Sequence, residues 1–270
     1  ERRLSLKPIS EVSRDVLREI RYVFTDIDDT LTEDGSLTAN AYAAVEALEK
    51  SGIAVVPITG RPAGWCDLIA RFWPVQGVVG ENGAFYFRYD QKARRMERFY
   101  ADAPEDREQK KKKLSQLAST ILDQVPNCAI SADQSYRETD LAIDFAEDVS
   151  RLTEEEIEMI VGAFHKVGAT AKVSSIHVNG WFGDYDKLSM TKIFSDRCLD
   201  LNLDTHGQTS IFIGDSPNDA PMFNFFQHSV GVANIRAFEG RLKTLPRFVT
   251  EGFGGKGFAE FSQVLIAAHR

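Results

Sequence analysis

The chain has 270 residues, a formal net charge of −8, an apolar fraction of 43% and a charged fraction of 27%. No stretch approaches the roughly 20 apolar residues of a membrane span, and general nucleic-acid binding depends on clustered lysine and arginine that an acidic chain lacks. One basic run, Lys110 to Lys113, lies in a polar segment typical of the exposed face of a helix. We therefore expect a globular protein with neither nucleic-acid nor membrane partners, as a monomer or a homodimer.

Three widely spaced cysteines, Cys66, Cys128 and Cys198, fit a reducing compartment better than a disulfide framework. We therefore expect a cytoplasmic protein. Residues 1–4 show no apolar signal region, although a chain that does not begin with Met leaves a removed leader open.

Apolar runs and helical periods alternate over the first third of the chain. We predict helices at about 10–19, 39–50 and 63–72, and strands at 22–25, 53–59 and 77–79. Continuous apolar runs such as 53–58 suit parallel strands that are covered on both faces. The βαβαβ order therefore predicts an α/β fold with a doubly wound, mainly parallel sheet.

The pattern changes at Phe85. Two strands at 85–89 and 96–100 are typical of a hairpin, and a charged helix at about 104–124 follows. A strand at 141–145, a helix capped by Thr153 and running to about Val167, and strands at 174–178 and 180–185 complete the block. The alternation predicts an antiparallel sheet with helices on one face. We assign 85–184 to an inserted α+β domain, and 1–84 with 185–270 to the core.

The first pattern returns after this insertion. We predict helices at about 188–201, 218–226, near 238–245 and at 258–268, and strands at 210–215, 230–232 and 248–249. These elements would complete the wound sheet.

The most informative run is Val23–Thr30, where an apolar strand ends in Asp26, Asp28 and Asp29. Carboxylates this crowded need a cation. Of two acids at positions i and i+2, one can act as a nucleophile or bind a metal while the other transfers protons. Taken alone, the run could equally be an acidic turn that caps the next helix.

Polar side chains also follow other predicted strands. Thr59 and Asp215 end two further strands, and ligands of wound sheets bind outside the carboxyl ends of the strands. We therefore expect Asp26, Thr59 and Asp215 to converge. The two acids suit Mg²⁺, and the threonine hydroxyl suits a phosphoryl oxygen.

The loop Gly214–Asp219 adds an amide, Asn218, and a second acid, Asp219, which we expect to orient a neighbouring group. The phosphoryl charge also needs a cation. Lys187 lies where the chain re-enters the core, and Lys192 is one helical turn further on. We prefer Lys187 because the junction is nearer the strand ends.

Over essentially its whole length the chain resembles phosphatases of the haloacid dehalogenase-like (HAD) superfamily, subgroup IIB, which includes Cof-type, sucrose-phosphate and mannosylphosphoglycerate phosphatases. The family's DxDxT motif is matched by Asp26–Thr30, its second motif by Thr59, its lysine by Lys187 and its GDxxND motif by Gly214–Asp219. The turn Asn82-Gly83-Ala84 is also similar. The chain departs from the family at Asp29, where Gly is more frequent, and we expect Asp29 to cap the turn.

The resemblance implies a mechanism. Asp26 attacks phosphorus, and Asp28 protonates the leaving alcohol and then deprotonates the hydrolytic water, a role that argues against the dehalogenase branch. Mg²⁺ would be held by the carboxylates of Asp26 and Asp215 and by the backbone carbonyl of Asp28. The implied phosphate-binding residues are Thr59, Gly60, Lys187 and Asn218.

The insertion would then be a cap that selects the substrate. Candidate substrate contacts, each of which could instead be surface or core, are Asn82, Arg61, Arg137, Glu138, His177 and Asn179.

The predicted function is Mg²⁺-dependent hydrolysis of a phosphate monoester, from a phosphorylated sugar or related small metabolite. Two alternatives stay open. A phosphomutase of the phosphomannomutase type shares the fold and nucleophile, although the loop Gly214–Asp219 resembles the hydrolase form. A catalytically silent phospho-ligand-binding protein is the other alternative, although every motif side chain is present.

Overall fold

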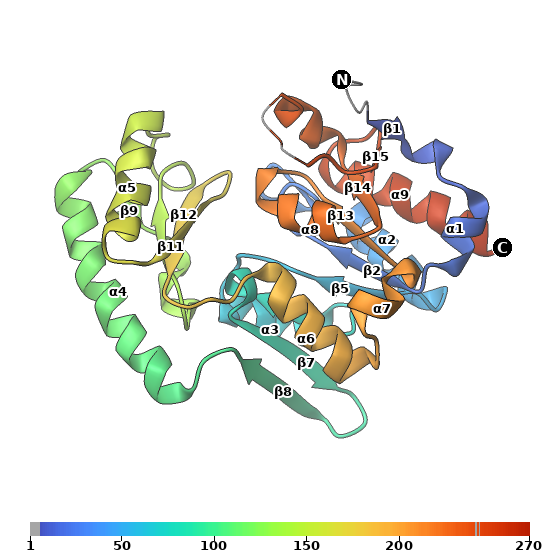
Figure 1. The fold of residues 1–270 in the computed structure, drawn as a ribbon, viewed down its shortest axis with the longest axis horizontal. Coiled ribbons are helices and arrows are strands. Elements are labelled where there is room, and N and C mark those ends of the chain that lie inside the picture. Colours follow the sequence, from blue (N-terminus) through green and yellow to red (C-terminus); the bar gives the residue numbers. More distant parts are fainter. Residues whose placement is uncertain (1–5, 241, 243) are drawn as a thin grey trace.

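The computed structural model describes residues 6–240, 242 and 244–270, so the N-terminal residues 1–4 considered above lie outside it. Figure 1 shows a larger lobe built from the first and last parts of the described chain and a smaller lobe built from its middle. Among the helices of the described part, none is long and apolar enough to cross a membrane.

The larger lobe is built on a six-stranded sheet in which every neighbouring pair is parallel. The prediction of a doubly wound parallel sheet is confirmed. Its strand order is β1 (Lys7–Pro8), β15 (Phe248–Val249), β14 (His228–Gly231), β13 (Ser210–Gly214), β2 (Tyr22–Thr25) and β5 (Ala54–Pro57).

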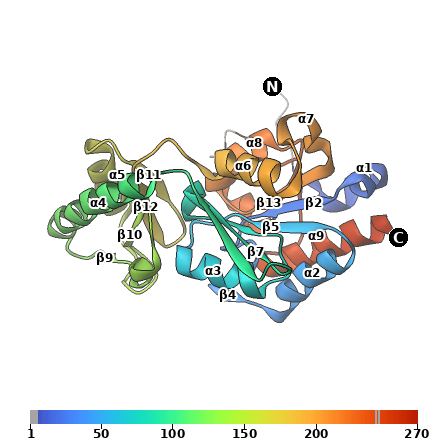
Figure 2. The same cartoon turned by 90° about the horizontal axis from the view of Figure 1, so that it is seen from below.

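Successive residues of the central strands enter different cores, as the alternation of side chains in a strand requires. Val23 and Ile211 pack on one face of the sheet, whereas Phe24 and Phe212 pack on the other. The first face is covered by α1 (Arg14–Glu19), α2 (Ala39–Lys50), α3 (Ala63–Phe72) and α9 (Gly254–His269). The second is covered by α6 (Lys187–Leu199), α7 (Leu203–His206) and α8 (Ala220–Phe225), and Figure 2 shows the two helix layers.

A three-stranded antiparallel sheet extends the larger lobe. It comprises β6 (Val78–Gly80), β7 (Phe85–Asp90) and β8 (Arg95–Tyr100), and a parallel bridge between Ile58 and Val79 joins it to the β5 segment. Phe85 and Phe87 are buried in the core of the larger lobe. The hairpin at 85–100 therefore packs with the core, and we propose that the boundary lies after it rather than at residue 85. Strand alternation alone does not say which lobe covers its apolar face.

The smaller lobe, here called the cap, has a four-stranded antiparallel sheet in the order β11 (Thr170–Val173), β12 (His177–Trp181), β10 (Leu141–Asp144) and β9 (Ala129–Ile130). It also contains α4 (Pro104–Gln124) and α5 (Glu154–Lys166), which starts with a capping box at Thr153. These elements share a core of their own, with Ile121, Ile143 and Phe164 among its buried members. We therefore propose that the cap begins at α4.

Some local predictions differ from the structure. The strands expected at 174–178 and 180–185 are β11 and β12, shifted toward the N-terminus. Gly180 lies where a Cβ atom would meet the ring of Phe164, so β12 passes directly over α5. The helix expected near 238–245 includes residues 241 and 243, outside the described part, and a 3-10 helix ends at Phe238. A small hairpin, β3 (Thr32–Glu33) and β4 (Ser36–Leu37), was not predicted.

Candidate active site

The ends of adjacent parallel strands bring the predicted residues together. Asp26 directly follows β2, and its backbone N–H donates to the carbonyl of Ile213 in β13 at 3.0 Å. Asp215 follows β13, on one side of β2, and Thr59 follows β5, on the other side of β2, by two residues. Because carboxyl ends of parallel strands lie along one edge of the sheet, the three residues share that edge.

Three buried acids form a cluster at this edge. One carboxylate oxygen each from Asp26, Asp215 and Asp219 lies within 4.8 Å of the others. The second oxygen of Asp219 accepts the backbone N–H of Asp215 at 3.1 Å. A Cβ atom on Gly214 would lie 2.4 Å from that oxygen, so this close approach depends on glycine. Asp219 thus holds the loop that presents Asp215.

Lys187 is the cation beside the cluster. Its Nζ lies 2.7 Å from an oxygen of Asp26 and 3.4 Å from one of Asp219. The residue opens α6, where Asp186 forms a capping box with Ser189. The turn at Gly83, with φ of +104°, packs against the backbone of Asp186 and leaves no room for a Cβ atom.

The alternative lysine, Lys192, is directed elsewhere. It pairs with Asp204 at 2.7 Å, away from the three acids. The N-terminal position in α6 therefore determines which lysine can reach the cluster.

Burial dominates the electrostatics of the acids. It raises the pKa of Asp26 to about 7, against the opposing effect of Lys187. Burial, then the charges of Asp219 and Asp26, raise the pKa of Asp215 well above its usual value. The pKa of Lys187 is raised because the charges of Asp26 and Asp219 outweigh its burial. Hard carboxylate oxygens that lack sufficient counter-charge fit a divalent cation such as Mg²⁺.

The carboxylate of Asp28 is held apart from these three acids. Arg61 donates from Nε to both of its oxygens, at 3.0 and 3.2 Å, and its Nη2 lies 2.9 Å from the first. Asp29, with φ of +57°, has the left-handed backbone that glycine adopts most readily, and its N–H donates to the hydroxyl of Thr32 at 2.9 Å. Burial raises the pKa of Asp29, against a hydrogen bond with Ser175 of the cap.

The remaining phosphate candidates line the boundary between core and cap. The hydroxyl oxygen of Thr59 accepts the N–H of Arg61 at 2.9 Å, which leaves its proton free to donate. A Cβ atom on Gly60 would contact the side chain of Asn82, whose buried Nδ2 has no hydrogen-bond partner among the described residues. Asn82, Lys187 and Asn218 line one pocket together with Lys172 and Trp181 of the cap.

Arg137, by contrast, is engaged within the cap. It is 2% exposed, and its guanidinium bonds Asp133 at 2.8 and 3.0 Å and Asp140 at 3.0 Å. It also donates to the carbonyl of Gly60 at 3.0 Å. We infer that Arg137 supports the loop after Thr59 rather than a substrate.

The other cap candidates also have protein partners. Asn179 donates to Asp140 at 3.0 Å, and the hydroxyl of Tyr100 donates to Glu138 at 2.6 Å. The Nε2 atom of His177 lies 2.8 Å from a carboxylate oxygen of Glu147. We therefore propose that Asn179 and Glu138 support the cap, whereas the Nε2 atom of His177 is buried and has no hydrogen-bond partner in the described part of the chain.

Sequence reasoning missed Glu81, the residue before Asn82. Its fully buried carboxylate accepts backbone N–H groups of Ala63 at 2.9 Å, and of Glu138, Thr139 and Asp140 at 2.9, 2.7 and 3.3 Å. Burial, then the charge of Asp140, raise its pKa to about 7. An acid placed directly after the apolar strand β6 was the available signal.

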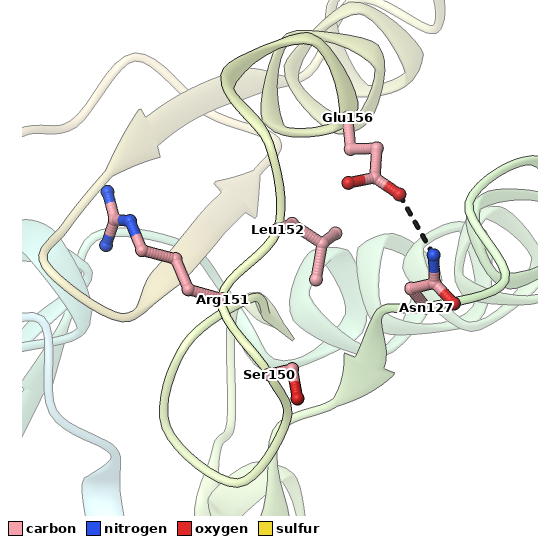
Figure 3. A pocket seen from close by; sticks show the side chains of 5 residues that line it. All are labelled: Asn127, Ser150, Arg151, Leu152 and Glu156. Atoms are coloured by element: carbon pink, nitrogen blue, oxygen red, sulfur yellow. Dashed lines mark hydrogen bonds between the residues drawn. The ribbon is translucent and has the colours of Figure 1, made fainter.

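A second hollow lies within the cap. It is lined by Asn127, Ser150, Arg151, Leu152 and Glu156, and Figure 3 shows the amide of Asn127 donating to Glu156. Glu156 also belongs to the capping box of α5. None of the residues identified above as acids, lysine or phosphate candidates contributes to it, so this hollow adds nothing to the site.

Comparisons with known proteins agree with this geometry. Residues 23–106 match the family model of haloacid dehalogenase-like hydrolases. No curated protein matches the chain. Among solved structures, a Thermoplasma acidophilum protein has a similar fold, with a TM-score of 0.69, 18% identity, and coverage of 92% of this chain and 99% of that one.

Two phosphatases share the fold. A HAD subclass IIB sugar phosphatase aligns with a TM-score of 0.60 at 14% identity, over 90% of this chain and 98% of that one. The sucrose-phosphatase of Synechocystis, solved with sucrose and phosphate, aligns with a TM-score of 0.59 at 13% identity, over 92% of this chain and 98% of that one. At these identities the likeness establishes the fold.

Proposed function

We propose that the chain, whose residues 23–106 match the haloacid dehalogenase-like hydrolases, is a Mg²⁺-dependent phosphatase of a phosphorylated sugar or related small metabolite. The observation that carries the proposal is the buried cluster of Asp26, Asp215 and Asp219 beside Lys187. Asp28, paired with Arg61 and 32% exposed, is the proposed proton-transfer group. This separation of the two carboxylates supports the proposed division of roles between Asp26 and Asp28.

The first half-reaction transfers the phosphoryl group to the protein. An oxygen of Asp26 forms a bond to phosphorus as the bond from phosphorus to the ester oxygen breaks. The proton of Asp28 passes to that ester oxygen, which leaves as an alcohol. In the second half-reaction, water gives a proton to Asp28 while its oxygen bonds phosphorus and the bond to Asp26 breaks. Both carboxyl groups are then restored.

The proposed charge stabilisation rests on groups at the strand ends. The hydroxyl of Thr59, the amide of Asn218 and the ammonium of Lys187 would donate to the equatorial phosphoryl oxygens. Mg²⁺, held by the carboxylates of Asp26 and Asp215 and the carbonyl of Asp28, would neutralise charge on the phosphoryl group when bound. Asp219 keeps Asp215 and Lys187 in place.

The proposed substrate class rests on the pocket between cap and core and on the fold shared with sugar phosphatases. A phosphate-release screen over sugar phosphates, with Mg²⁺ and with a chelator, tests it directly. We expect release with Mg²⁺ and its loss with the chelator. Absence of metal-dependent release across the panel would contradict the proposal, and an isomerised sugar phosphate without free phosphate would indicate a mutase.

Mg²⁺ should stabilise the protein more at about pH 8 than at about pH 5.5, because carboxylate ligands must lose their protons to bind a metal. The pKa of Asp26 is raised to about 7 and that of Asp215 is raised well above its usual value, so protons compete with the metal below about pH 7. Thermal unfolding with Mg²⁺ and with a chelator at both pH values measures the difference. An equal shift of the melting temperature at the two pH values would contradict a site built on these acids.

A further inference from the structure

Arg61 lies between the proton-transferring carboxylate and the cap. It directly follows Thr59-Gly60, is 7% exposed, and its guanidinium lies 4.6 Å from the ring centroid of Trp65. Stacking on an aromatic ring and multiple carboxylate partners fix a guanidinium plane more firmly than either contact alone. Arg61 is therefore a rigid donor fork at the edge of the site.

The fork divides its donors between the two lobes. Nε and Nη2 are directed at Asp28 of the core. Nη1 faces the cap, 3.5 Å from an oxygen of Glu147 and 3.8 Å from one of Asp133. A single side chain thus links the acid of the core to the charges of the cap.

The two cap carboxylates have further partners within the cap. Asp133 accepts from Arg137 at 2.8 and 3.0 Å, and from the hydroxyl of Ser131 at 2.8 Å. Glu147 lies 2.8 Å from His177. The contacts of Nη1 therefore depend on the position of the cap relative to the core.

The two oxygens of Asp28 are not equivalent. Oδ1 has two short contacts with Arg61, at 2.9 and 3.0 Å, whereas Oδ2 has one at 3.2 Å. The side chain of Asp28 is 32% exposed, so it remains accessible at the site. Oδ2 is thus the less tightly held oxygen, and the better placed of the two to carry and transfer a proton.

We propose that Arg61 is a positioning residue. It aims the less tightly held oxygen of Asp28 at the leaving group, and its contacts with Glu147 and Asp133 make that orientation depend on the position of the cap. The inference rests on the proposed phosphatase function. It makes Asp28 the partner of Arg61, whereas the sequence predicted that Arg61 contacts the substrate. Proton transfer contributes about 10²- to 10⁴-fold to rates, and this is the range that Arg61 should influence.

The test compares two esters for wild type, Arg61→Gln and Arg61→Lys. An alkyl phosphate taken from the phosphate-release screen needs a proton on its leaving oxygen, whereas para-nitrophenyl phosphate releases a stable phenolate without one. We expect Arg61→Gln to lower kcat/KM at least ~10²-fold on the alkyl ester and less than about tenfold on the nitrophenyl ester, with Arg61→Lys intermediate. The inhibition constant of inorganic phosphate should stay unchanged, since Arg61 acts on Asp28.

An equal loss on both esters with weaker phosphate inhibition would overturn the proposal and make Arg61 a phosphate ligand, and no loss on either ester would also overturn it. If wild type hydrolyses neither ester, the proposed function itself fails.

The proposed link between Arg61 and the cap is tested by Glu147→Gln, which leaves Asp28 and Arg61 in place. We expect a loss of about three- to tenfold confined to the alkyl ester. The control is Glu154→Gln, a change at an exposed cap residue paired with Arg151. Unchanged alkyl-ester activity in Glu147→Gln would overturn the link between cap and acid.

Discussion

Replacing Asp26 by asparagine is expected to abolish phosphate release, with kcat lowered by about 10⁴-fold or more. An amide cannot form the proposed phosphoryl-enzyme, and it also removes one of the three clustered acids. Steady-state assays on the best ester of the screen measure the loss. Acid-quenched samples should contain a covalent phosphoenzyme in the wild type and none in the variant.

The matched control is Asp196→Asn, the same change at an exposed aspartate of α6, which should leave kcat unchanged. The melting temperature of the Asp26→Asn protein shows whether a loss of activity is due to the missing carboxylate or to misfolding. Burial disfavours the charged form of Asp26, as its raised pKa shows, so the neutral side chain should not lower the melting temperature measured in a chelator. Full phosphate release by a folded Asp26→Asn protein would exclude Asp26 as the nucleophile.

Replacing Glu81 by glutamine should lower the free energy of unfolding by about 2–4 kcal/mol near neutral pH. Both oxygens of the carboxylate accept hydrogen bonds from backbone N–H groups. One oxygen accepts from Ala63 and Glu138, and the other accepts from Thr139 and Asp140. Glutamine turns one of these acceptors into an NH₂ group, which must face backbone N–H donors. Urea unfolding of wild type and variant measures the difference.

The pH dependence of that difference identifies the carboxyl group. The pKa of Glu81 is raised from 4.5 to about 7 in the folded protein, so its contribution to stability is full below about pH 4.5 and is lost as pH rises through about 7. Glutamine does not titrate, and the gap between the two proteins should therefore widen as pH falls from about 7. Glu158→Gln, at an exposed position of α5, should show no gap. A gap that is independent of pH would contradict the raised pKa.

The comparison of Lys187 with Lys192 illustrates how far local sequence goes. The motif and the junction favoured Lys187, but both lysines belong to α6 and are separated by little more than one turn. Only the packing of the Gly83 turn against Asp186 shows which end of the helix meets the acids. Helical periodicity predicts which face of a helix is buried. Which end of the helix lies at the site depends on tertiary packing.

The sequence by itself determined the alternation of strands and helices, because apolar runs and helical periods are local patterns set by the burial of neighbouring residues. It also predicted that Asp26, Thr59 and Asp215 lie at one edge of the sheet, since parallel strands end there.

Only the tertiary structure decided that the hairpin at 85–100 packs with the core, that Arg61 is paired with Asp28, and that Glu81 holds the backbone of the cap. Each of these depends on buried contacts between residues far apart in the chain. Such contacts produce no periodic pattern in a sequence. A charged residue that is exposed to solvent cannot be distinguished in the sequence from one that pairs with a buried partner.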